Sequence, residues 1–336
     1  MSALRPYAEE PVVFGRDHSL VGVTCRPVAP PPAPRPFVIF LNAGIIHRSG
    51  PNRMTVRLAR ALARVGVPSL RFDLSGIGDS IVPPSAAAMS IQERVSIDID
   101  DAMAFARAHW GAETFVMGGL CSGADNALRT AARSSDVAGL FLLDLNVCRT
   151  SGYYVRHVAR RLFDGGTWRN VFTGRHPLVR AMLARAGLRR AVDGSAHDDP
   201  ALPHDAVVPY DEMRAHLHHL MARDARLLCI FTAGLEAQYN YRRQFLHLFP
   251  DVPFGDRLRL RYFADSDHVF TGSTLQERLT REVVAWVSET AFPASGEPSG
   301  RDAPATVRRY SLTPRSLLRR RGTQRAFGSS ESGRGR

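Results

Sequence analysis

The sequence predicts an α/β protein: a doubly wound, mostly parallel sheet with a helical lid insertion. From Phe37 onward, short apolar runs alternate with helical stretches, the pattern of sequential βα units. Many of these runs are continuously apolar, as strands covered on both faces are. One interruption of the alternation, residues 146–224, is too long to be a plain connector.

The expected elements follow in chain order. Residues 11–25 alternate apolar and polar side chains around Gly15, which predicts an N-terminal hairpin, and a proline-rich connector completes residues 1–36. Strands are expected at 37–42, 67–73, 113–118, 139–145, 226–232 and 257–263, and helices near 53–65, 91–109, 122–133 and 275–291. Residues 37–145 and 225–292 should therefore form the core of the fold.

The insertion at 146–224 is expected to be a helical lid. It is rich in arginine, histidine and aromatic residues. In open parallel sheets the ligand crevice lies beyond the carboxyl ends of the strands, and this insertion follows such an end. We expect it to cover the site and to select the substrate.

The net charge of +12 is concentrated in the C-terminal tail. Residues 301–336 hold ten arginines against Asp302 and Glu331, so the rest of the chain is nearly balanced. The whole segment 293–336 is rich in Gly, Ser, Pro and Arg and should be disordered. Its charge is the one feature that would suit nucleic acid or an acidic surface.

The sequence has the features of a cytoplasmic protein with free thiols. No apolar run approaches the roughly 18 residues that a membrane span needs, and the N-terminus lacks the pattern of a secretory signal. The cysteines, Cys25, Cys121, Cys148 and Cys229, form no CxxC pair and have no metal-ligand spacing.

A nucleophile elbow is predicted where the strand 113–118 meets the helix 122–133. The turn reads Gly119-Leu120-Cys121-Ser122-Gly123. In a sharp strand-turn-helix elbow, the positions two before and two after the nucleophile must be small. With Cys121 at the centre both flanks are glycine, whereas with Ser122 at the centre Leu120 would be one flank. The pattern therefore favours Cys121, whose thiolate a helix N-terminus and a nearby histidine would stabilise.

His268 is the expected base. It follows the last predicted strand and precedes the last helix, which matches the order nucleophile, acid, histidine of the α/β-hydrolase fold. The acid that orients it is expected to be Glu236, just after the strand 226–232. Asp144, at the end of the strand 139–145, is the alternative.

Two backbone N–H groups are expected to bind the oxyanion that forms during acyl transfer. Ser122, directly after the nucleophile, would supply one. Ala43, in the small-residue loop after the strand 37–42, would supply the other. His47 and Arg48 follow closely and could bind an acidic group of a substrate.

No cofactor or metal is predicted. The chain has no lysine, so it has no P-loop, and no dinucleotide-binding glycine pattern follows a strand. His216 and His219 have a helical i, i+3 spacing, but no carboxylate or cysteine completes a ligand set.

Five segments resemble a family of bacterial α/β hydrolases close to the serine-aminopeptidase-like and exosortase-associated hydrolases, over about residues 10–290. They are LNAGIIHRSGPNR (41–53), RFDLSGIGDS (71–80), GGLCSGADNA (118–127), YNYRRQF (239–245) and DSDHVF (265–270). The resemblance implies Cys121 as nucleophile and His268 as base, and a structural role for the turn at 73–80.

These observations predict a hydrolase that cleaves a small-molecule ester or thioester through an acyl-cysteine intermediate. An acyltransferase that passes the acyl group to an alcohol or amine would use the same residues. A non-catalytic binding protein that has kept the fold is the remaining alternative.

Overall fold

The computed structural model describes residues 6–29, 35–156, 208–235, 237–290 and 292. They belong to one compact unit, Met1–Ser299; a second unit, Gly300–Arg336, lies outside the described residues, as does the rest of the predicted tail.

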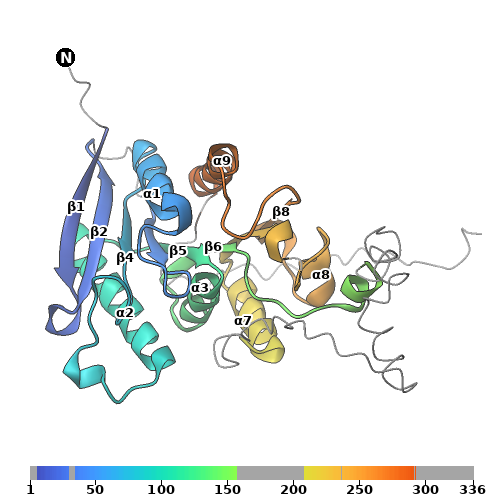
Figure 1. Cartoon of the computed structure of the whole chain (residues 1–336), viewed down its shortest axis with the longest axis horizontal. Helices are drawn as coiled ribbons and strands as arrows, with labels where there is room; N and C mark the ends of the chain where they lie inside the picture. The colour runs from blue at the N-terminus through green and yellow to red at the C-terminus, as the bar shows by residue number, and fades with distance from the viewer. Residues whose placement is uncertain (1–5, 30–34, 157–207, 236, 291, 293–336) are drawn as a thin grey trace, which may run out of the picture. The chain divides into compact units, whose positions relative to one another are not determined.

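An eight-stranded sheet forms the centre of the fold (Figure 1). Its strand order is β1-β2-β4-β3-β5-β6-β7-β8. The strands are β1 (Tyr7–Phe14), β2 (Leu20–Pro27), β3 (Phe37–Leu41), β4 (Ser69–Phe72), β5 (Phe115–Leu120), β6 (Val137–Leu143), β7 (Arg226–Thr232) and β8 (Leu258–Phe263). β2 is antiparallel to β1 and β4, whereas the pairs from β4 to β8 are parallel. The doubly wound, mostly parallel sheet is confirmed, with strand ends close to those predicted.

Helices cover both faces of the sheet (Figure 1). α1 (Met54–Arg64) and α9 (Ser273–Glu289) lie on one face, and α2 (Ile91–Trp110), α3 (Ser122–Arg133) and α7 (Tyr210–Ala222) lie on the other. In β3, Val38 packs against the layer of α1 and α9, and Ile39 packs against the layer of α2, α3 and α7. This burial on both sides explains why the central strands read as continuous apolar runs.

The described chain also contains shorter elements. They are α8 (Gln244–Leu248), the helical residues 151–156 and the 3-10 turns Arg16–His18, Pro51–Arg53, Pro84–Ala86, Ala233–Leu235 and Gly255–Arg257. None of the described helices is long and apolar enough to cross a membrane.

The start of α2 is fixed by its own sequence. Ser90 accepts a hydrogen bond from the Glu93 N–H, and the Glu93 carboxylate accepts one from the Ser90 N–H. This reciprocal pairing satisfies N–H groups that would otherwise lack a partner at a helix start. The first turns of α2 therefore have a defined position.

α7 belongs to the helical layer of the sheet, although it lies in the segment predicted as a lid. Its residues Met213, Leu217 and Leu220 are buried in the core cluster that also contains α2 and α3. The helix therefore covers the face of the sheet. Residues 157–207, the larger part of the predicted lid, lie outside the described residues.

We predict that Leu217→Ala lowers the free energy of unfolding by about 2–5 kcal/mol, because it leaves a cavity in a fully buried position. Urea unfolding measures the change. His219→Ala, an exposed position on the same helix, is the matched control and should change stability by less than about 0.5 kcal/mol. Equal, small effects of the two substitutions would contradict the placement of α7 in the core.

Candidate active site

Cys121 lies on the turn between β5 and α3, with a backbone conformation that few non-glycine residues adopt. Its φ is 55° and its ψ is −121°. Positive φ costs free energy in a residue with a side chain, and such strain gathers at functional sites. Its N–H donates to the Leu143 carbonyl at 2.9 Å, which continues the β5–β6 ladder to the turn.

The two glycines that flank the turn are required by close backbone contacts. A Cβ atom on Gly119 would lie 2.8 Å from the Leu41 carbonyl oxygen, and one on Gly123 would lie 2.7 Å from the Asn42 carbonyl oxygen. Both distances are shorter than real Cβ contacts. The end of β3 thus packs directly against the elbow, as the glycine pattern of the sequence indicates.

Ser122 has a different position and different contacts from Cys121. It is the first residue of α3, and its Oγ accepts a hydrogen bond from the Gly44 N–H at 2.7 Å. The hydroxyl therefore links the loop after β3 to the start of α3. The side chain that interacts with His268, by contrast, is that of Cys121, which helps to raise the pKa of the imidazole.

His268 follows β8, in a loop that packs against the loop after β7. The Gly234 N–H donates to the Ser266 carbonyl at 3.1 Å. A Cβ on Gly234 would lie only 2.0 Å from the His268 backbone nitrogen, so a side chain there would push the histidine loop away. Gly234 therefore allows the imidazole to reach the elbow.

Asp144 is the carboxylate that holds His268. It follows β6, is fully buried and accepts from the His268 Nδ1–H at 2.8 Å. Thr232, at the end of β7, donates to the same carboxylate through its N–H at 2.7 Å and its Oγ1–H at 2.6 Å. Both oxygens of the buried carboxylate therefore have hydrogen-bond donors.

Of the two acids expected from the sequence, the structure places the alternative, Asp144, at His268 Nδ1. Glu236 lies outside the described residues, so its role stays a prediction. The strand order explains the position of Asp144: β6 lies between the strands that lead to Cys121 and to Thr232, so the end of β6 is beside both.

His268 has a strongly raised pKa. The hydrogen bond to Asp144, followed by the hydrogen bond to Cys121, raises the pKa of the imidazole to about 10. The ring is then protonated near neutral pH, with Nδ1–H toward Asp144 and the other nitrogen available to the sulfur.

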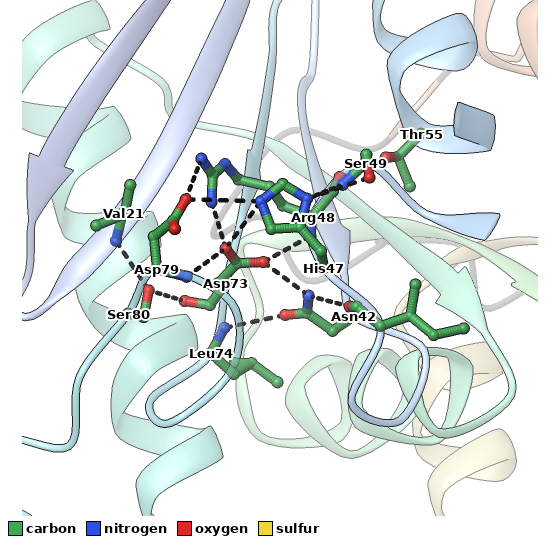
Figure 2. Close-up of polar contacts among 11 residues, drawn as sticks. Val21, Asn42, His47, Arg48, Ser49, Thr55, Asp73, Leu74, Asp79 and Ser80 are labelled. Atoms are coloured by element: carbon green, nitrogen blue, oxygen red, sulfur yellow. Dashed lines mark hydrogen bonds and ion pairs between the residues drawn. The ribbon is translucent and has the colours of Figure 1, made fainter. Parts of the chain in front are cut away.

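A buried carboxylate also organises the loop after β3, which holds the expected oxyanion donor Ala43. Figure 2 shows contacts from several segments converging on Asp73, the residue after β4. Its carboxylate accepts from the Arg48 N–H at 2.5 Å, from the Asn42 side-chain amide at 3.2 Å and from the Asp79 N–H at 3.3 Å. Asn42 also accepts from the Leu74 N–H at 2.9 Å. The loop after β3 and the turn after β4 are thereby held together.

Arg48 belongs to this same network. Its guanidinium forms ion pairs with the buried Asp73 and with Asp79 (Figure 2). His47, Asp73 and Asp79 lie close enough together to be considered as metal ligands, but both carboxylates are bound by Arg48. Arg48 therefore has a structural role and is not free to bind an acidic substrate group.

The oxyanion donors expected from the sequence lie on either side of the turn. Ala43 and Cys121 pack on the same apolar cluster. The Gly44 N–H is used by Ser122, which leaves the preceding amide, Ala43, as the candidate in this loop. Ser122 opens α3, where N–H groups have no partner within the helix.

A buried polar pair that the sequence analysis did not predict lies near Cys121 Sγ. The Asn146 side-chain amide donates to Asp125 at 2.5 Å and lies 3.9 Å from Cys121 Sγ. Neither Asp125 Oδ1 nor Asn146 Oδ1 has a partner among the described residues, and burial raises the pKa of Asp125 to about 7. The sequence does contain a signal for this pair, because Asp125 is an acidic residue four positions after Cys121 on the buried side of α3.

The comparisons with known proteins identify the fold. No protein-family model and no curated protein matches the sequence. Among solved structures, the chain is similar to an esterase from Pyrococcus furiosus, with 12% sequence identity, a TM-score of 0.52 and coverage of 84% of this chain and 91% of that one. The chain has the α/β-hydrolase fold. A hypothetical protein from Pseudomonas aeruginosa shares the fold at 13% identity and a TM-score of 0.51, with coverage of 87% and 96%.

We predict that His268 makes the stability of this α/β-hydrolase fold depend on pH. Its pKa in the folded protein, about 10, lies above the ordinary 6.5, so the folded state binds the proton more tightly. The resulting stabilisation is complete below pH 6.5 and is lost as the pH rises toward 10. Unfolding by urea at pH 6, 8 and 10 should show the stability of the wild type falling toward that of His268→Gln, by at most about 1.4 kcal/mol per pH unit. A constant difference between the two proteins would contradict the raised pKa.

Proposed function

We propose that the protein is an ester or thioester hydrolase that forms a covalent acyl-cysteine intermediate. The observation that carries the proposal is the arrangement of Cys121 on a strained turn, His268, whose pKa the Cys121 sulfur helps to raise, and the buried Asp144, which is hydrogen-bonded to His268. A nucleophile, a base and a group that orients the base are the parts that acyl transfer needs.

In the first half of the reaction, the Cys121 sulfur attacks the carbonyl carbon of the substrate. The thiolate is the form of a cysteine that attacks, and the imidazolium of His268 is its counter-ion in this step. A C–S bond forms while the carbonyl oxygen takes up the negative charge. When the tetrahedral intermediate collapses, the bond to the leaving group breaks and His268 gives its proton to the departing alkoxide or thiolate.

The negative charge on oxygen would be held by the N–H groups of Ser122 and Ala43. Fixed backbone donors aimed at developing charge contribute strongly, because they need no reorganisation during the reaction. The Asp73 network supports this role, since it fixes the loop that carries Ala43.

In the second half, water attacks the acyl-cysteine. His268 is then neutral, having given up its proton, and it accepts one from the attacking water. The thiolate leaves, the carboxylic acid is released, and the imidazolium beside Asp144 is restored. If an alcohol or amine replaced water in this step, the same residues would perform acyl transfer.

We predict that Cys121→Ala lowers the turnover of activated esters such as p-nitrophenyl acetate by at least about 10³-fold, because no nucleophile remains. The control is Cys148→Ala, which removes an exposed thiol and should keep full activity. Mass spectrometry of the wild type mixed rapidly with the ester should find the acyl group on Cys121.

Full activity of Cys121→Ala would refute the proposal. Absence of both turnover and acylation in the wild type would favour a non-catalytic protein. Faster decay of the acyl-enzyme with an added alcohol or amine than in water would identify an acyltransferase.

We further predict that Asp144→Asn lowers kcat/KM by about 10²–10⁴-fold, because an amide can neither hold the charged imidazole nor keep its tautomer. Glu236→Gln is the matched comparison and should retain activity near that of the wild type. The reverse ranking of the two variants would assign the acid to Glu236. Circular dichroism of both variants checks that each remains folded.

A further inference from the structure

A groove of about 680 Å³ opens beside the elbow. Its walls are the start of the loop after β3, the turn that follows β4, the first two turns of α2 and the first turns of α3. Its volume lies within the roughly 300–1,000 Å³ of sites that hold small molecules.

Apolar atoms form most of the exposed surface of the groove. Leu74, Ile77, Val82 and Val95 form its apolar surface. Ile45 and Ile91 lie at the rim, where they are 90% and 73% exposed. Large apolar groups left in water beside a cavity are typical of a binding site for an apolar ligand.

Most polar side chains along the groove are bound within the protein. Asp98 accepts from the Ser75 N–H and Ser75 Oγ–H, both at 2.7 Å. The Gln92 carbonyl accepts from Arg129 at 3.0 Å, and Arg94 donates to the Met89 carbonyl at 3.2 Å. Ser90 caps α2, and Asn42 and Ser122 also form hydrogen bonds within the protein. Asn126 is the remaining polar residue of the lining. A ligand in this groove therefore meets mainly hydrocarbon.

One end of the groove is formed by residues that are next to the elbow cysteine and to the expected oxyanion donor in sequence. Gly44 and Ser122, joined by their 2.7 Å hydrogen bond, both line it. Ser122 directly follows the nucleophile, and Gly44 directly follows the expected oxyanion donor Ala43. A substituent of a carbonyl group bonded to Cys121 Sγ would enter the groove from this end.

We propose that this groove binds the acyl chain of the substrate, so that the enzyme acts on esters or thioesters of aliphatic, medium-chain acids. This rests on the proposed function, because the position of the chain is set by the bond to Cys121. The groove selects for chain length through apolar burial, and the leaving group lies outside it.

The first test is a series of p-nitrophenyl esters from acetyl to dodecanoyl. kcat/KM should rise about fourfold per added methylene, the gain from burying one CH₂, until the groove is filled. A second series keeps the acetyl group and lengthens an alkyl thioester leaving group, and it should stay nearly flat. A flat acyl series, or a rise in the second series only, would overturn the assignment to the acyl chain.

The second test fills the groove with a larger side chain. Val82→Trp should lower the ratio of octanoyl to acetyl turnover by at least about tenfold, because the indole occupies space that the chain needs. The matched control is the neighbouring Ile81→Trp, which is 61% exposed, does not line the groove and should leave the ratio unchanged. An equal ratio in both variants would contradict the proposal.

A binding measurement separates this inference from the proposed function. Isothermal titration of decanoate into the wild type, into Val82→Trp and into Ile81→Trp requires no turnover. We expect binding that Val82→Trp weakens and Ile81→Trp does not. Such binding without an acyl-cysteine would refute the hydrolase but keep the groove, whereas acylation of Cys121 by acetyl esters without decanoate binding would refute the groove alone.

Discussion

The contact between the end of β3 and the glycines of the elbow is the constraint on which the site depends. Two carbonyl oxygens, of Leu41 and Asn42, lie where side chains on Gly119 or Gly123 would have to be. This approach brings the loop after β3 beside Cys121. The hydrogen bond from the Gly44 N–H to Ser122, the position of Ala43 and the inner end of the groove all follow from it. Removing either glycine would separate these parts even if every catalytic side chain remained.

Three buried aspartates show how the fold treats negative charge near the site. Asp73 forms an ion pair with Arg48 and accepts hydrogen bonds from backbone N–H groups, so it holds the two segments in place. Asp144 is bound by Thr232 and His268, so its charge is directed at the imidazole. For Asp125 the strongest donor is the uncharged Asn146 amide, and burial accordingly raises its pKa to about 7. The same residue type thus serves as an anchor, an orienting group and a weak acid, according to the donors that surround it.

The sequence predicts the parts of this protein that depend on local pattern. The central strands are apolar because both faces are covered, and the elbow is marked by glycines because backbone passes within contact distance. The choice between Asp144 and Glu236 depends instead on which strands are neighbours. Only the sheet order shows that the end of β6 lies beside Thr232 and within reach of His268. The sequence also does not show that α7 covers the sheet, because an apolar helical face does not indicate which surface it packs against.

The hydrogen bond that Ser122 accepts has a consequence for covalent inhibitors. Its hydroxyl lies next to Cys121 in sequence, yet it accepts a hydrogen bond from the Gly44 N–H, while His268 is hydrogen-bonded to Asp144 and interacts with Cys121. A serine needs a base at its oxygen to attack a phosphonate or carbamate warhead. Reagents of that class would therefore find no activated serine at this elbow, and selective inhibitors would come from soft electrophiles that carry an aliphatic tail.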